Sequence, residues 1–233
     1  MQLFFDKDLD TNQPTFLVEK DESKHILRVL RKKIGDTIYI TNGKGLACEG
    51  EIIGMPSKQC EIKILEKYEQ NELPYKLHIG IGPTKSADRF EYFLEKVTEI
   101  GITEITPIIC KNSERKRLNM SRCEKILQSA MKQSQRFYLP KLNELKSLDQ
   151  FLSIDFSQTE KFIAHCEDRE KFSFKETISE SKDILLLIGP EGDFSKTEID
   201  NILKNKFRPV SLGETRLRTE TAGIVATTIV AFG

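Results

Sequence analysis

The segment GPEGD, residues 189–193, places one carboxylate between two glycines and beside a proline. It follows five consecutive apolar residues, Ile184–Ile188, which is the pattern of a strand buried on both faces. Glycine allows conformations and close approaches that other residues do not, and open α/β sheets bind ligands at the carboxyl ends of their strands. The segment therefore predicts a binding loop that holds Glu191 at the sheet edge. A tight structural turn with an exposed glutamate is the alternative interpretation.

A second segment, VSLGETRLRTETA at residues 210–222, has a similar organisation. A short strand ends near Gly213, and Arg216 and Arg218 then precede Glu220 at the start of a predicted helix. Two glycine-bearing loops that follow strands indicate one site built from both loops. No G-x-G-x-x-G follows a strand in this chain, so neither loop is a dinucleotide-binding loop. Neither loop holds a histidine, which disfavours histidine-based catalysis.

The helix after the first loop has a strong start signal. Ser195 and Glu198 have the spacing of a capping box, and Phe194 is placed to pack against Ile199 as a hydrophobic staple. Such a cap contributes about 1 kcal/mol. The GPEGD loop is therefore held between a buried strand and an independently fixed helix.

From residue 76 onward, apolar strand patterns alternate with amphipathic helix patterns. Strands are predicted at 76–82, 102–110, 161–166, 184–188 and 208–213, and helices at 86–101, 121–136, from 195 onward and over 219–232. The helix at 121 has a predicted capping box, Ser121 with Glu124. The last segment suits a strand or a helix, and we predict a helix because Thr219 or Thr221 can cap it. This alternation predicts an α/β domain with a parallel sheet covered on both faces.

The first 70 residues differ. They predict one short helix at 23–33, a hairpin around Asn42-Gly43 and further alternating strands, which together indicate a small antiparallel sheet or barrel. The polar segment 69–75 is the predicted boundary, with the second domain covering 74–233.

Composition excludes several classes of protein. Thirty-six Lys and Arg balance thirty-six Asp and Glu, so any nucleic-acid surface must be local. Five scattered cysteines without a C-x-x-C pair and three histidines without ligand spacing predict reduced thiols and no metal site. No apolar run is long enough to span a bilayer, and the N-terminus carries acids where a signal peptide would carry bases. We expect a soluble, cytoplasmic protein without membrane contact.

The two C-terminal segments carry a family resemblance. LLIGPEGDFS (186–195) with LGETRLRTETA (212–222) resembles the RsmE family of small-subunit ribosomal RNA methyltransferases, within the SPOUT class. Weaker matches are HILRVLRKKIGD (25–36), EKVTEIGITEITPII (95–109), SERKR (113–117) and SAMKQSQR (129–136). The chain departs from the family at Asp193, where many members have a second glycine.

The resemblance implies a PUA-like β-barrel domain at 1–70, which binds RNA, followed by a SPOUT-type knotted parallel sheet domain at 74–233. The implied reaction is methylation of uridine N3 in 16S rRNA, within the 30S subunit, with S-adenosylmethionine as donor and the protein as a homodimer. The implied cofactor contacts are Ile188, Gly189, Glu191, Gly192, Leu212, Gly213, Leu217, Arg218 and Ala222.

Uridine N3 carries a proton that must leave, so the site should stabilise a developing uracil anion. Arg218 is the candidate for this role, while Glu220 could accept the proton or orient the arginine. An Arg218–Glu220 ion pair that only closes the loop is the alternative. The candidate RNA contacts are Lys24, Arg28, Arg31, Lys85, Arg89, Arg115, Arg117 and Arg136, although each cluster taken alone could be a solvated face. Two competing hypotheses are a SPOUT enzyme acting on ribose 2′-OH and a non-catalytic ribosome-assembly factor.

Overall fold

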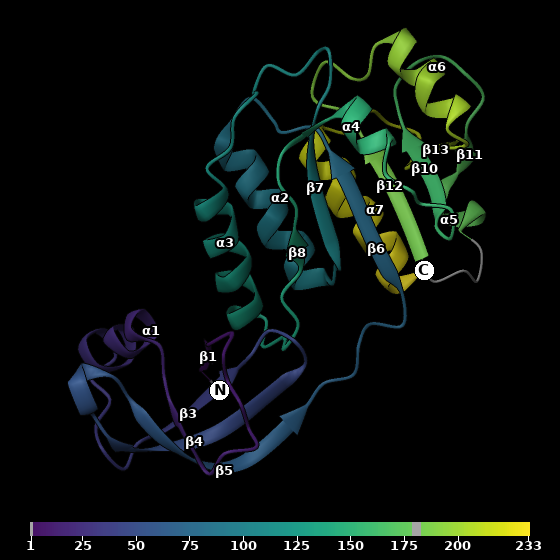
Figure 1. Ribbon diagram of the computed structural model, residues 1–233. Helices are drawn as coiled ribbons and strands as arrows, with labels where there is room; N and C mark the ends of the chain where they lie inside the picture. Colours follow the sequence, from purple (N-terminus) through teal and green to yellow (C-terminus); the bar gives the residue numbers. More distant parts are fainter. Residues whose placement is uncertain (1, 179–182) are drawn as a thin grey trace. The chain divides into compact units, whose positions relative to one another are not determined.

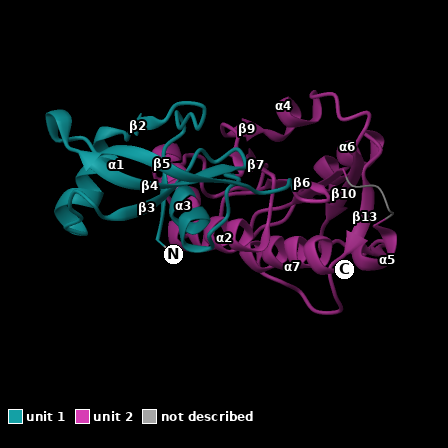
Figure 2. Cartoon of the chain, turned by 90° about the horizontal axis from the view of Figure 1, so that it is seen from below, with its two compact units in different colours: residues 1–72, 128–139 teal, residues 73–127, 140–233 magenta. Residues whose placement is uncertain are grey.

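The computed structural model describes residues 2–178 and 183–233 (Figure 1). The chain divides into two compact units, which Figure 2 shows in different colours. The first unit, called the N-terminal unit here, contains residues 1–72 and 128–139, and the second, the C-terminal unit, contains residues 73–127 and 140–233. The sequence did not predict that residues 128–139 belong to the N-terminal unit.

The N-terminal unit is built on a five-stranded sheet. Its strands, in spatial order, are β1 (Leu3–Phe5), β3 (Thr37–Thr41), β4 (Leu46–Gly54), β5 (Glu61–Glu69) and β2 (Thr15–Leu17). All neighbours are antiparallel except β1 and β3. The pairing of β4 with β5 shifts register twice, and such bulges increase the twist of a sheet. The prediction of a small antiparallel sheet or barrel is confirmed, except that the β1–β3 pair is parallel.

The hairpin predicted at Asn42-Gly43 joins β3 to β4 through the loop 42–45, in which Gly43 and Gly45 take φ of +70° and +95°. The predicted helix at 23–33 has different bounds. It runs as α1 (Lys20–Lys24) and continues as a π-helical turn, His25–Val29. It ends there because Arg31 takes a left-handed φ of +56°, which a helix does not accommodate.

The C-terminal unit is built on an eight-stranded sheet whose strands are all parallel. Its main path runs β11 (Phe172–Ser173), β13 (Arg208–Ser211), β10 (Glu160–Ala164), β12 (Asp183–Ile188), β6 (Lys76–Ile81), β7 (Glu104–Ile109) and β8 (Lys141–Leu142), and β9 (Lys146–Ser147) also pairs with β7. The predicted parallel α/β sheet is confirmed, with the apolar run at 184–188 as a central strand.

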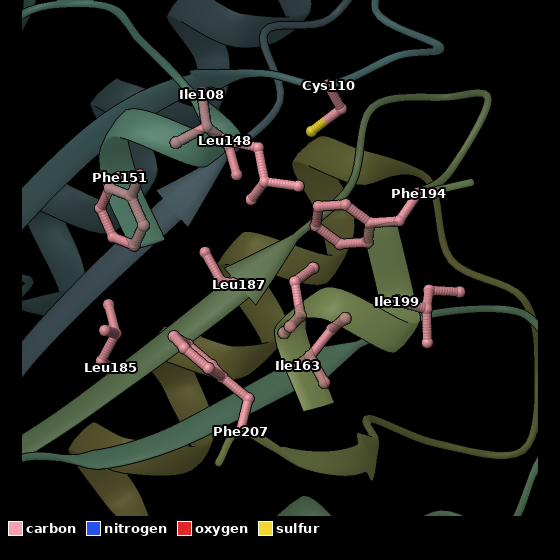
Figure 3. Packing of buried hydrophobic residues seen from close by; sticks show 11 residues of the cluster. Ile108, Cys110, Leu148, Phe151, Ile163, Leu185, Leu187, Phe194, Ile199 and Phe207 are labelled. Atoms are coloured by element: carbon pink, nitrogen blue, oxygen red, sulfur yellow. The ribbon is translucent and has the colours of Figure 1, made fainter. Parts of the chain in front are cut away.

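Helices cover both faces of this sheet. On one face, Leu185 and Leu187 of β12 belong to a buried cluster with Phe151 of α4 (Leu148–Leu152) and Ile199 of α6 (Lys196–Lys204), as Figure 3 shows. On the other face, α2 (Ala87–Ile100) packs against α7 (Thr219–Phe232), which also contacts β6 and β12. A Cβ at Gly223 of α7 would overlap the ring of Phe93, so glycine permits this close approach.

The described residues also form α3 (Met120–Gln133), α5 (Phe174–Thr177) and a short 3-10 helix, Pro56–Lys58. None of the helices in the described residues is both long enough and apolar enough to span a bilayer.

Helix starts test the predicted caps. The Ser195–Glu198 capping box opens α6 as predicted, with both of its hydrogen bonds present. The predicted box at Ser121 is wrong because α3 begins one residue earlier, and Asn119 Oδ1 accepts from the Arg122 backbone N–H instead. The last segment is helical as predicted, but no side chain caps it.

Candidate active site

The C-terminal unit contains a cavity of about 820 Å³ at the carboxyl ends of β10, β12 and β13. Three chain segments and one residue of α2 line it. The lining residues are Ala164, His165, Cys166 and Lys171; Ile188–Glu191 and Asp193; Val210–Thr219 and Ala222; and Arg89. The two predicted glycine loops therefore face one space, as expected because both follow strands of one parallel sheet, β12 and β13, which β10 separates.

Eight of the nine residues predicted to contact the cofactor line this cavity, and Gly192 is the exception. The carbonyl oxygen of Gly192 accepts a hydrogen bond of 2.9 Å from Asn112 Nδ2. A Cβ added at Gly192 would come within 2.9 Å of Asn112 Cβ. In this structure Gly192 therefore fits the first loop against the segment after β7 and does not face the cavity.

A buried hydrogen bond ties the two loops together. Thr219 Oγ1 donates to the carbonyl oxygen of Gly189 over 3.0 Å, and Thr219 is only 5% exposed. This bond occupies the hydroxyl of Thr219, one of the two residues predicted to cap α7. The first loop also contacts the end of β6, because Gly82 N–H donates to Ile188 O over 2.9 Å. Gly82 lies so close to Pro190 that a Cβ at this position would clash with it.

Glu191 is anchored through the neighbouring loop after β6. Its Oε1 accepts a hydrogen bond of 2.9 Å from the backbone N–H of Lys85. The Arg115 guanidinium holds that loop in place by donating to Thr84 O at 2.9 Å and to Lys85 O at 2.6 Å. Arg115 was predicted as an RNA contact. In the structure its guanidinium stabilises the loop after β6, whose Lys85 N–H binds Glu191.

The departure at Asp193 has a conformational explanation. Its φ is +58°, the left-handed region that favours glycine but is tolerated by aspartate. Its carboxylate accepts hydrogen bonds from Phe194 N–H at 2.8 Å and from Cys166 N–H at 2.6 Å. Asp193 thus adopts a backbone conformation that glycine adopts more easily. Its side chain in addition connects the first loop to the segment after β10.

The sequence analysis did not predict that the segment after β10, residues 164–171, contributes to the site. His165 is 7% exposed, and neither of its ring nitrogens has a hydrogen-bond partner. Burial lowers the pKa of His165, and nearby Lys171 lowers it further, so both favour the neutral ring. The available signal was the polar pair His165-Cys166 directly after the apolar strand, at the same sheet edge as the two recognised loops.

Among the described residues, no group of three His, Cys, Asp or Glu side chains could hold a metal ion.

Arg218 and Glu220 lie at the start of α7 but in different environments. Arg218 is exposed, lines the cavity and makes no ion pair with another described residue. Glu220 is 7% exposed, and its Oε1 lies 3.8 Å from Arg89 Nε, while its Oε2 has no hydrogen-bond partner. The carboxylate is thus paired with Arg89 and not with Arg218, and Arg89 also lines the cavity.

The other predicted RNA contacts are divided between the two units. In the C-terminal unit, Lys85 forms an exposed ion pair with Glu114, and Arg117 is exposed. In the N-terminal unit, Lys24 and Arg28 line a second cavity, Arg31 is exposed and Arg136 is half-buried.

Comparison with known proteins covers both units. Residues 71–231 match a family model described as an RNA methyltransferase domain, and residues 18–65 match an RNA methyltransferase PUA domain. A relative from Buchnera aphidicola, named ribosomal RNA small subunit methyltransferase E, is 33% identical over 97% of this chain and 91% of its own length.

Two solved structures agree with this chain over nearly their full length. A probable rRNA-methyltransferase from Porphyromonas gingivalis is 36% identical with a TM-score of 0.88. A ribosomal RNA small subunit methyltransferase E from Neisseria gonorrhoeae, crystallised with S-adenosylmethionine, is 27% identical with a TM-score of 0.87. Each alignment covers 97% of this chain and 95% of the other.

Proposed function

Because the chain belongs to the ribosomal RNA small subunit methyltransferase E family, we propose that it methylates N3 of one uridine in 16S rRNA, with S-adenosylmethionine as methyl donor. The observation that carries this proposal is the single cavity formed by the two glycine-bearing loops, which the Thr219–Gly189 hydrogen bond ties together. In this proposal residues 1–70 form the RNA-binding domain and residues 74–233 the methyltransferase domain.

The cavity fits a cofactor of this kind. Its volume of about 820 Å³ lies within the range of about 300–1,000 Å³ typical of small-molecule sites. Ile188, Leu212 and Leu217 offer apolar surface for a purine, while the loop backbones and the unpartnered His165 offer polar groups. When bound, S-adenosylmethionine supplies a methyl group activated on a sulfonium.

Arg218 is the residue proposed to favour the reaction electrostatically. Loss of the N3 proton leaves negative charge shared with the uracil oxygens, and a cation beside them stabilises that charge. Arg218 suits this role because its guanidinium borders the cavity and is not engaged in an ion pair with a described carboxylate.

Glu220 suits a positioning role better than that of a proton acceptor. Its carboxylate is buried, does not line the cavity and is paired with Arg89. A carboxylate in the first turn of a helix is also stabilised by the helix dipole. We therefore assign to Glu220 the task of holding the Arg89 guanidinium at the rim of the cavity.

The proposal places the reaction on the 30S subunit in the cytoplasm, with the protein acting as a homodimer. The family membership supports the RNA partner. Light scattering during size-exclusion chromatography measures the oligomeric state, and a mass of one chain would contradict the dimer.

The reaction is tested by incubating the protein with 30S subunits that lack the modification and with methyl-labelled S-adenosylmethionine, followed by nucleoside mapping. Label on uridine N3 is the expected result. Label on ribose would replace the proposal with 2′-OH methylation, and cofactor binding without transfer would contradict an enzymatic role.

A matched pair of variants tests the role of Arg218. We expect Arg218→Gln to lower the rate of methyl transfer by about 10²–10³-fold, the usual effect of removing one charge-stabilising group. Arg216→Gln removes an exposed arginine from the same loop and cavity, and should have a much smaller effect. Equal losses in both variants would show that Arg218 contributes only general positive charge.

A further inference from the structure

The N-terminal unit contains a second cavity of about 370 Å³, which we call the basic cleft. It is lined by Lys20, Lys24, Leu27, Arg28, Met55 and Lys58. One wall is α1 with its π-helical continuation, and the other is the turn Pro56–Lys58 together with Met55. Only two of its four cations, Lys24 and Arg28, were among the RNA contacts predicted from the sequence.

The residues that line the basic cleft include four cations and no carboxylate. Its four cations are exposed, and none forms an ion pair with another described residue. By contrast, Lys132 in the same unit pairs with Glu22 at 2.8 Å. Four like charges around a small hollow repel one another, and a bound polyanion would relieve that repulsion.

Both walls depart from regular backbone geometry at the residues that line the cleft. Leu27 and Arg28 lie within the π-helical turn His25–Val29, a conformation often associated with functional sites. Ser57 and Lys58 take positive φ values of +50° and +66°, which are unfavourable for residues other than glycine. Strained backbone positions of this kind cost about 1–3 kcal/mol each and cluster at ligand-binding and catalytic sites.

The cleft also has an apolar wall. Met55 is 38% exposed, and Leu27 is half-buried beside it in the lining. The methionine thioether makes favourable contacts with aromatic rings. Cations with an adjacent apolar wall suit a nucleotide, because phosphates contact the cations and the base contacts the apolar side chains. Bases that are not stacked in a helix are the usual targets of RNA-binding modules.

We infer that the basic cleft binds one unstacked nucleotide of a single-stranded segment of the substrate RNA, with Met55 and Leu27 against the base and the cations on the adjacent phosphates. The inference rests on the proposed function for the identity of the substrate class. It adds an RNA-binding site in the N-terminal unit, whereas all residues that line the proposed cofactor cavity belong to the C-terminal unit.

The phosphate contacts are tested with two double variants of equal charge change. Lys24→Gln with Lys58→Gln removes two cleft cations. Lys44→Gln with Lys67→Gln is the control and removes two exposed lysines. They lie near the β3–β4 loop, at the end of these strands opposite to Met55. Fluorescence anisotropy of a labelled single-stranded RNA is measured over a series of salt concentrations, and circular dichroism checks the fold.

We expect the cleft variant to bind about tenfold more weakly near 0.15 M salt, with a salt slope about 1.4 smaller, since each phosphate contact contributes about 0.7 on single strands. The control variant should keep the wild-type slope. Equal loss in both variants would overturn the inference, because the attraction would then be diffuse.

The base contact is tested with Met55→Ser and two RNAs of equal length, one normal and one abasic. We expect about two- to tenfold weaker binding of the normal RNA, the range of thioether–ring contacts, with an unchanged salt slope. Binding of the abasic RNA should not change. An equal effect on both RNAs, or no effect on either, would overturn the assignment of a base to this cleft.

Failure of the proposed function would look different. If wild-type protein transfers no methyl group to 30S subunits but the cleft variant still loses RNA affinity, the cleft stands and the enzymatic proposal falls. If methyl transfer to uridine N3 is observed and the cleft variant binds RNA as the control does, the enzymatic proposal stands and the cleft falls. Affinity for S-adenosylmethionine, measured by calorimetry, should be equal in both double variants.

Discussion

The hydrogen bond from Thr219 Oγ1 to Gly189 O is the most direct structural link between the two loops of the cofactor cavity. Thr219→Val keeps the β-branched shape and removes only the hydroxyl. A buried hydrogen bond contributes about 1 kcal/mol, and a carbonyl left without its partner costs about 1–3 kcal/mol. The free energy of unfolding should therefore fall by about 1–3 kcal/mol, as measured by urea denaturation.

The same change should weaken cofactor binding. Without the bond, the two loops lose a contact that favours the arrangement in which they share one cavity. If about 1–2 kcal/mol of that preference is lost, the dissociation constant for S-adenosylmethionine rises about 5- to 30-fold, since 1.4 kcal/mol corresponds to a factor of ten. Isothermal titration calorimetry measures this change directly.

Thr227→Val is the matched control. Thr227 lies in the same helix, is fully buried, and its Oγ1 donates to Gly223 O over 2.8 Å. That acceptor lies four residues earlier in the same helix, so the bond joins no loops. We expect unchanged cofactor affinity for this variant. Wild-type affinity in Thr219→Val, or an equal loss in both variants, would refute the reasoning.

Three further predictions concern the C-terminal unit. Asp193→Ala should lower the free energy of unfolding by about 2–3 kcal/mol in urea, because it loses two hydrogen bonds and keeps an unfavourable φ; Asp193→Asn should lose less. Gly223→Val should cost about 2–3 kcal/mol in the same measurement, because its side chain would overlap the buried ring of Phe93. Burial lowers the pKa of His78 from 6.5 to about 4. The neutral ring therefore stabilises the fold above pH 6.5, and this stability, at most about 3 kcal/mol, is lost as the pH falls from 6.5 to 4. His78→Gln should flatten that part of the pH profile of unfolding, and an unchanged profile would show that other groups set it.

The elements that were predicted correctly are those with local physical causes. Ile184–Ile188 is apolar at each position because β12 is buried on both faces, and the Ser195–Glu198 box needs only its own first turn. The convergence of the two loops followed from the geometry of parallel strands. Each of these inferences required no knowledge of distant contacts.

The features that were not predicted depend on contacts between residues far apart in sequence, or on a choice between two residues that could each cap the same helix. Glu220 pairs with Arg89, which lies 131 positions earlier, and no sequence spacing predicts that contact. Asn119 and Ser121 are both residue types that cap helices, and the structure uses Asn119, the earlier one. Thr219 could cap its helix, yet its hydroxyl donates to Gly189 instead.

The position of β12 has a consequence for folding. It pairs with β10 on one side and β6 on the other, so these earlier strands are joined only when residues 183–188 insert between them. Before that step, a partly assembled sheet presents the apolar edge strand β6, and open edges of this kind promote aggregation. Pairings between strands far apart in sequence also form slowly. Refolding from denaturant should therefore be slow and highly cooperative, and recovery of active protein should improve as the chain is diluted.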